Sequence, residues 1–174
     1  SRGLGDVYKR QVQKAEKARE AGECMGEALP ELRDIMHKIK ETYDVSKENV
    51  GVGSTIFAVK PGDGSAREQA ASCQKVLGGW ANIANEYATK RYRSNLINWG
   101  MLPFIVDKGE LPFANGDYIF IPQITEAVKN KATSMKAYVV NKDMKEFTLK
   151  MDELTDDERQ IILDGCLINY YRNN

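Results

Sequence analysis

The stretch GDGSAREQ, residues 62–69, combines residue types that could bind a small acid and remove a proton from it. Two glycines, Gly62 and Gly64, are followed at once by the hydroxyl of Ser65 and the guanidinium of Arg67. An apolar, strand-like run precedes the stretch and a helix-like run follows it, so these residues occupy a strand-to-helix turn. Glycines let another molecule approach the backbone closely, and a helix N-terminus attracts anions through its free amides.

The guanidinium favours a carboxylate as the bound group. A cation in the first turn of a helix is slightly unfavourable, because the helix N-terminus already carries positive partial charge. The planar donors of Arg67 match a carboxylate in geometry, and a hydroxyl in such a positive field would have a lowered pKa, as a base requires. A phosphate site is less well supported, because the pattern G-x-x-x-x-G-K-[ST] does not occur.

The same residues also fit a purely structural role. Ser65 and Glu68 form the capping-box pattern S-x-x-E, in which each side chain bonds the backbone amide of the other. Thr155 and Glu158 repeat this pattern at the start of the last predicted helix. In this role Arg67 would be a solvated residue of the first helical turn. The residues alone leave both interpretations open.

Strands and helices alternate around this turn, which predicts a mixed α/β fold with a helical N-terminal third. The predicted strands cover 50–59, 80–84, 101–106, 117–121, 135–141 and 146–151. The predicted helices cover 29–43, the run from the glycine turn to Gly78, then 87–99, 123–130 and the segment after Thr155. We expect the first strand to be buried, Pro103 to stand at a sheet edge or a strand end, and Cys166 to be buried on the last helix.

Composition and charge exclude several classes of protein. Lys plus Arg and Asp plus Glu each total 25, so no net field attracts nucleic acid or an anionic membrane. No apolar run approaches the ~20 residues of a membrane span. The three cysteines have long spacings and no C-x-x-C, so they predict no zinc site or disulfide framework. We expect a cytoplasmic protein whose cysteines pack as small apolar residues; an iron–sulfur cluster on these cysteines is the weaker alternative.

Two motifs together resemble the aconitase family. GDGSAREQAA is followed by RYRSNLINWGMLP, residues 91–103, and the C-terminal swivel domain of that family carries G-S-S-R-E-H or G-S-x-R-E-Q and then R-x-N-L-x-N-x-G-x-L-P. The match covers roughly residues 50–122. It implies a swivelling β/β/α domain over residues 12–174, with a helical lead-in at 12–48 and a core at 49–174. Residues 1–11 show neither a strand-like nor a helix-like periodicity and are treated as a non-native leader.

The resemblance implies the C-terminal part of an iron–sulfur hydro-lyase, similar to aconitate hydratase, that acts on a citrate-like hydroxy acid. Ser65 would be the catalytic base and Arg67 would bind a substrate carboxylate, with Gly64 and Ala66 in the same substrate-binding loop. A 4Fe–4S cluster would be held by domains 1–3 of the same protein, and this chain would hold no metal. We therefore expect the chain alone to be inactive, with those domains and a small carboxylic acid as its partners.

Two substitutions depart from the family pattern, and two other functions stay open. Ala66 replaces a second serine that helps to hold substrate, and Gln69 replaces a histidine, so the substrate is not defined. The first alternative is a stand-alone small subunit of an isopropylmalate isomerase-like dehydratase, although the missing initiator methionine favours a single longer chain. The second is a non-catalytic binding module, for which the basic run Lys90–Arg93 would be the candidate surface.

Overall fold

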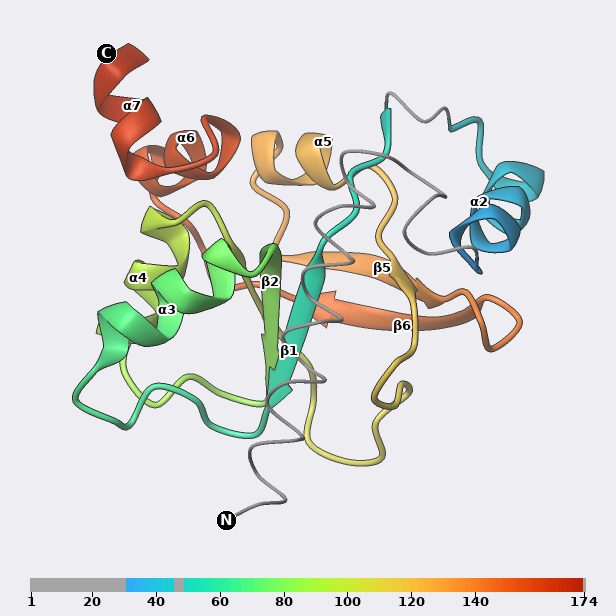
Figure 1. Cartoon of the computed structure of the whole chain (residues 1–174), viewed down its shortest axis with the longest axis horizontal. Helices are drawn as coiled ribbons and strands as arrows, with labels where there is room; N and C mark the ends of the chain where they lie inside the picture. Colours follow the sequence, from blue (N-terminus) through green and yellow to red (C-terminus); the bar gives the residue numbers. More distant parts are fainter. Residues whose placement is uncertain (1–30, 46–48, 174) are drawn as a thin grey trace.

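A mixed six-stranded sheet organises the described part of the chain, residues 31–45 and 49–173, in the computed structural model (Figure 1). The strand order is β1-β2-β3-β6-β5-β4. The strands are β1 (Ser54–Ala58), β2 (Gly79–Ala84), β3 (Leu102–Ile105), β4 (Ile119–Phe120), β5 (Ser134–Val139) and β6 (Lys145–Lys150). The helices are α2 (Glu31–Thr42), α3 (Arg67–Val76), α4 (Lys90–Asn98), α5 (Ile124–Lys129), α6 (Asp156–Leu163) and α7 (Leu167–Asn173). The predicted α/β class is confirmed.

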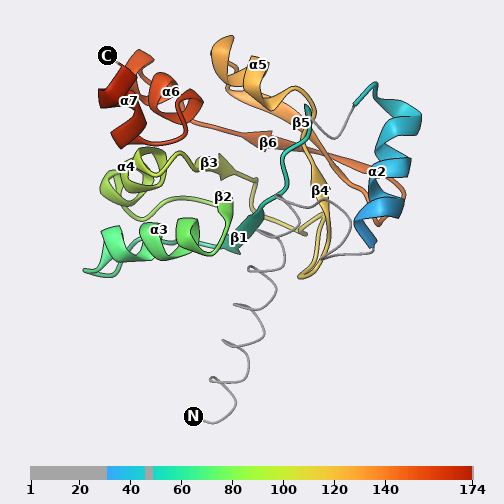
Figure 2. The same ribbon diagram turned by 45° about the horizontal axis from the view of Figure 1, so that its top comes forward.

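The first three strands form a parallel half-sheet with two helical crossovers. β1 pairs with β2 and β2 with β3, both in parallel register. The crossovers through α3 and α4 step in the same direction, so the right-handed rule for such connections puts both helices on one face. Figure 2 shows α3 and α4 together on that face. The carboxyl ends of all three strands consequently meet at one edge, the place where ligands bind in open parallel sheets.

The other three strands form an antiparallel half-sheet. β6 joins β3 at the single pair Ile105 and Lys150, and β5 and β4 continue the antiparallel pairing outward. The hairpin predicted around positions 142–143 is therefore confirmed. The main core lies among β2, β3, β5, β6, α4, α5 and α6, and its fully buried members include Ile97, Phe104, Ala137, Val139 and Leu149.

Two strand predictions need correction. The run 50–59 forms only the five residues of β1, and Ile56 is 45% exposed rather than buried. Among the strands of the described residues, β1 lies at the edge and pairs with β2 alone, so it lacks the burial of a central strand. β3, in contrast, lies inside the sheet. Of the two positions predicted for Pro103, the sheet edge is therefore wrong and the strand end is right, because Pro103 is the second residue of β3. It is buried, and its missing N–H is tolerated because the pairing with β6 is limited to Ile105.

The predicted amphipathic helix and the last capping box are confirmed. α2 buries the stripe of Leu32, Ile35, Met36 and Ile39. Thr155 accepts a bond from the Glu158 amide, and the Glu158 side chain accepts one from the Thr155 amide, so both halves of the box are formed. The part of the helical lead-in before residue 31 lies outside the described residues. None of the helices in 31–45 and 49–173 is long and apolar enough to cross a membrane.

The last predicted helix is interrupted, which changes the place of a cysteine. Gly165 has a φ of +90° and turns the chain between α6 and α7. Cys166 therefore lies in the link between these helices and is only partly buried, so the prediction of a buried position on a continuous helix is wrong. Cys73 is exposed on α3, which also contradicts a packing role for it. Cys24 lies outside the described residues.

Candidate active site

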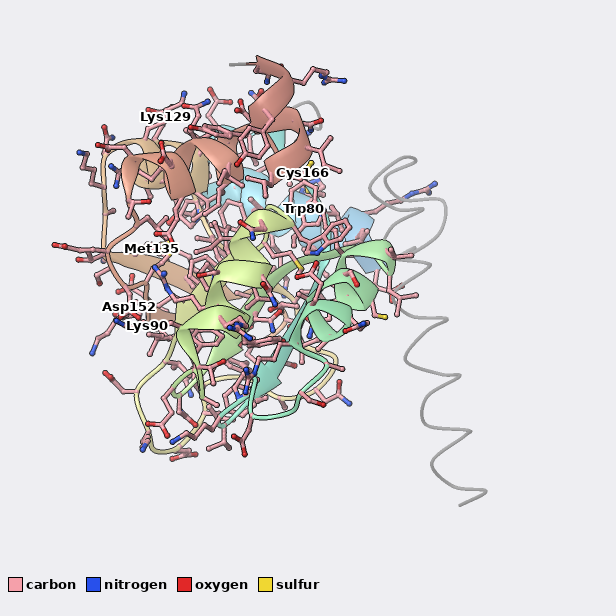
Figure 3. The ribbon with its side chains drawn as sticks, turned by 90° about the vertical axis from the view of Figure 1, so that its left-hand side faces the viewer. Trp80, Lys90, Lys129, Met135, Asp152 and Cys166 are labelled. Atoms are coloured by element: carbon pink, nitrogen blue, oxygen red, sulfur yellow. The ribbon has the colours of Figure 1, made fainter. Side chains whose placement is uncertain are left out.

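The glycine turn lies at the carboxyl edge of the parallel strands, as expected for a ligand site in this architecture. It connects the end of β1 with the start of α3, and the chain that follows β2 runs beside it. Trp80 stands at the start of β2, whereas Lys90 begins α4, which follows the end of β2; Figure 3 shows the two residues apart from each other. Lys90 follows Thr89, whose side chain bonds the turn, so the turn and Trp80 stand at opposite ends of the half-sheet.

Three successive hydrogen bonds hold the segment before the turn against the segment after β2. They run from the Glu86 amide to the Val59 carbonyl at 3.2 Å, from the Ala88 amide to the Pro61 carbonyl at 2.9 Å, and from the Thr89 hydroxyl to the Gly62 carbonyl at 3.2 Å. The first two are backbone bonds and extend the pairing of β1 with β2 beyond the strands. The third depends on a side chain. The backbone that enters the turn is therefore well defined up to Gly62.

Gly62 is required at its position by both conformation and space. Its φ is +98°, in the left-handed region that favours glycine, and a Cβ atom there would stand 2.5 Å from the Cβ of Tyr92. Tyr92 is only 2% exposed, and its hydroxyl accepts hydrogen bonds from Gln74 and Asn82, each at 3.0 Å. Burial and these two hydrogen bonds hold the Tyr92 side chain in place against the turn. It therefore leaves no space for a residue larger than glycine at position 62.

The guanidinium of Arg67 is hydrogen-bonded through Nε, whereas its two Nη atoms are not bonded to the described residues. Its Nε donates to the Gly62 carbonyl at 3.0 Å, and the side chain is partly buried. Its two Nη atoms make no hydrogen bond or ion pair with the described residues. This arrangement leaves a pair of parallel N–H donors for an external group, and a carboxylate matches that pair in geometry and charge.

The structure contradicts the capping-box interpretation of Ser65. α3 begins at Arg67, its N-cap is Ala66, and no side chain caps it. Glu68, the other half of the pattern, accepts a bond from Trp99 Nε1 at 2.7 Å instead. Ser65 is exposed, and its hydroxyl has no hydrogen bond with the described residues. The hydroxyl is therefore available to a molecule outside this chain.

Ion pairs tie the carboxyl ends of the three strands together. Glu86, after β2, contacts Lys60, after β1, at 2.8 Å and Lys108, after β3, at 3.7 Å. The hydrogen bond from Lys60 and then the charge of Lys108 hold the pKa of Glu86 below its usual value. All three side chains are more than 40% exposed, so the pairs add little stability. Their consequence is that the negative charge of ionised Glu86 is balanced by the two lysines and does not oppose an anion at this edge.

The described residues do not fit a metal cluster. Within 31–45 and 49–173, no group of three or more His, Cys, Asp or Glu side chains could hold a metal ion. Cys73 and Cys166 lie on α3 and in the link before α7, and neither belongs to such a group. These residues therefore do not provide a binding site for an iron–sulfur cluster.

The basic run at the start of α4 is largely structural. Tyr92 is buried, so it cannot stack on a base. Arg93 donates to Glu158 at 3.2 Å and to the Glu153 carbonyl at 3.1 Å, and so joins α4 to the segment that leads into α6. Lys90 and Arg91 are the exposed members. The run therefore does not form a continuous basic surface.

One residue of the site is missing from the sequence-based interpretation. Thr89 is the N-cap of α4, where it accepts from the Tyr92 amide, and its hydroxyl also donates to the Gly62 carbonyl. The predicted helix begins at residue 87, which hides this role. A signal for it is present in the sequence, because a threonine directly before KRYRSNL is typical of a helix N-cap.

The two glycines of the turn should respond differently to alanine. A methyl group added at Gly64 would meet no atom within 4 Å, and the residue has no left-handed φ, so Gly64→Ala should leave the melting temperature unchanged. Gly62→Ala should lower the free energy of unfolding by about 1–3 kcal/mol, because of its φ and the Tyr92 ring. If another molecule closes on the turn, Gly64→Ala should still weaken its binding. Thermal melts of both variants test the two stability effects, and substrate titrations test the binding effect. A Gly64→Ala variant with a lowered melting temperature would contradict the expected difference between the two glycines.

Comparison with known proteins places the chain in a family. The family described as "Aconitase C-terminal domain" matches residues 8–109. Aconitate hydratase A of Rickettsia bellii is 30% identical over 156 residues, which cover 86% of this chain and 17% of that protein. The methanogen homoaconitase small subunit of Methanocaldococcus jannaschii is 33% identical over 111 residues, which cover 64% of this chain and 56% of that subunit.

A solved structure agrees with these sequence matches. The crystal structure of 3-isopropylmalate dehydratase from Methanocaldococcus jannaschii superposes with a TM-score of 0.52 and 29% identity, over 80% of this chain and 75% of that one. The predicted aconitase-type fold is thereby confirmed. The chain spans less than two thirds of the length of the two curated relatives above. It is a member of the aconitase C-terminal domain family.

Proposed function

We propose that this chain supplies the base and a carboxylate-binding arginine of a hydro-lyase that dehydrates and rehydrates a citrate-like hydroxy acid. The observation that carries the proposal is the turn itself. Arg67 is fixed through Nε to the Gly62 carbonyl and has two unbonded Nη atoms, while the hydroxyl of Ser65 in the same turn is also unbonded within the described residues. The family membership supports a hydro-lyase, since the relatives named above include a hydratase and a dehydratase.

The chain's residues would act on the carbon next to a bound carboxylate. The Nη pair of Arg67 holds that carboxylate, so the neighbouring C–H bond stays close to Ser65. Deprotonated Ser65 takes the proton, the C–H electron pair forms the carbon–carbon double bond, and the hydroxyl on the adjacent carbon leaves as hydroxide with the electron pair of its C–O bond. That hydroxide becomes water by taking a proton from a general acid, which the rest of the enzyme would supply. In the hydration direction Ser65 returns the proton. The charge of Arg67 and the amides at the start of α3 stabilise the deprotonated serine.

The remaining half of the active site would come from outside this chain. The described residues offer no metal-binding group, so the 4Fe–4S cluster that we propose for the complete enzyme would be held by its other domains. Those domains would also cover the turn, because a base works best where water is excluded. Ser65 is exposed in this chain, which is consistent with a site that is complete only after closure.

A stand-alone small subunit is the second candidate, because one of the matched relatives is itself a small subunit. The chain covers 75% of the solved 3-isopropylmalate dehydratase chain and 56% of the homoaconitase small subunit, but only 17% of aconitate hydratase A. In this form the partner would be a separate large subunit and the substrate a substituted malate. The gene sequence upstream of this chain distinguishes the two: a C-x-x-C pair and a third cysteine in the same reading frame would show a single-chain enzyme.

Anaerobic reconstitution tests the proposal. The chain alone, incubated with iron and sulfide, should develop no visible cluster absorption and should form no product from citrate, isocitrate or 3-isopropylmalate. The same chain within its complete enzyme, or mixed with its large subunit, should show cluster absorption and should form product. A stoichiometric cluster on the chain alone, or a complete enzyme that turns over none of these acids, would contradict the proposal.

A further inference from the structure

Two side chains from different elements bond the same carbonyl oxygen beneath the site. The Gly62 carbonyl accepts from Arg67 Nε at 3.0 Å and from Thr89 Oγ1 at 3.2 Å. Arg67 opens α3 and Thr89 caps α4, so they are far apart in the sequence. The carbonyl oxygen has two lone pairs, and these donors occupy both. Thr89 thus contacts the group that orients Arg67 without contacting Arg67 itself.

The peptide that carries this carbonyl has no other side-chain support among the described residues. The backbone ladder ends one residue earlier, at the bond from the Ala88 amide to the Pro61 carbonyl. Gly62 has no side chain, so its backbone dihedral angles are less restricted than those of any other residue. Loss of the Thr89 hydroxyl would therefore let the carbonyl rotate, and Arg67 would lose its fixed partner.

We propose that Thr89 is a positioning residue, which holds the Gly62 carbonyl in the orientation that points the Nη pair of Arg67 toward a bound carboxylate. That the bound group is a carboxylate rests on the proposed function. That the orientation of Arg67 depends on Thr89 does not. Thr89 also caps α4, but a cap needs only an acceptor, and the bond from the Tyr92 amide is long at 3.3 Å. The hydrogen bond that the Thr89 hydroxyl donates to the Gly62 carbonyl is the one that positions Arg67.

Hydrogen exchange at the Arg67 side chain tests this directly. In the full 174-residue chain labelled with ¹⁵N, the Nε–H of Arg67 should be protected. Thr89→Val should make it exchange about threefold to tenfold faster, as expected for a weakened hydrogen bond. Thr89→Ser keeps the donor and the acceptor, so it should behave as the original chain. If Thr89→Val does not fold, Thr89→Ala replaces it.

Thr155→Val is the matched control. It also removes a threonine N-cap, that of α6, and so lowers stability without touching the turn. Its Arg67 Nε–H should exchange at the original rate. An unchanged rate in Thr89→Val, or an equal rise in Thr155→Val, would overturn the proposal, because the effect would then be absent or a general loss of stability.

Titration with tricarballylate, a tricarboxylic acid without a hydroxyl, separates this inference from the proposed function. It should shift the Arg67 side-chain resonances in the original chain and in Thr89→Ser, and bind about threefold to tenfold more weakly to Thr89→Val. If exchange depends on Thr89 but tricarballylate shifts no Arg67 signal in any variant, either in the chain alone or in the complete enzyme, the positioning role stands and the carboxylate site of the proposed function fails.

Discussion

Replacing Ser65 with alanine is expected to lower the turnover number of the complete enzyme about a hundredfold or more. Proton transfer by a positioned group contributes on that scale, and a group that acts only in the transition state affects turnover rather than substrate binding. The Michaelis constant should therefore change little, provided that it reports binding. Steady-state kinetics of the cluster-loaded enzyme with citrate, isocitrate and 3-isopropylmalate measure both quantities.

The structure makes the stability of the same variant equally informative. Ser65 caps no helix and makes no hydrogen bond with the described residues, so Ser65→Ala should melt at the original temperature. Thr155→Ala is the control, because Thr155 is a true cap and its loss should cost about 1 kcal/mol. A Ser65→Ala variant that melts lower, as Thr155→Ala does, yet turns over at the original rate would show that Ser65 is structural.

Elements with local signals could be predicted from the sequence. The apolar stripe of α2, the hairpin of β5 and β6, and the Thr155 box all depend on residues within a few positions of one another. The turn residues of the candidate site could be proposed for the same reason, since two glycines, a serine and an arginine stand within six positions. Such signals need no knowledge of the strand order.

The features that the sequence did not reveal depend on contacts between distant residues. Ser65 and Thr155 open the same four-residue pattern, yet only Thr155 caps a helix. The difference lies in Glu68, whose carboxylate bonds Trp99, 31 positions away, instead of the backbone. Likewise, the exposure of Ile56 follows from the edge position of β1, which pairing across the whole sheet decides.

Replacing Arg67 with lysine is expected to raise the Michaelis constant about tenfold to a hundredfold with a smaller effect on turnover. Lysine keeps the positive charge but presents a single ammonium, so it cannot bond the Gly62 carbonyl and offer two parallel donors to a carboxylate at once. Charge-assisted bonds of this kind are worth about 1.5–3 kcal/mol. Arg172→Lys, at an exposed position on α7, is the control and should change neither constant. A Michaelis constant that stays the same in Arg67→Lys would contradict the assignment of Arg67.

Combining this variant with Thr89→Val shows whether both residues act through one carbonyl. If Thr89 matters because it orients Arg67, it has nothing left to orient once Arg67 is lysine. Thr89→Val alone should then raise the Michaelis constant, whereas Thr89→Val added to Arg67→Lys should raise it no further. Residues that share a partner are expected to be non-additive in this way. Fully additive effects would mean that Thr89 affects substrate binding by a route that does not pass through Gly62 and Arg67.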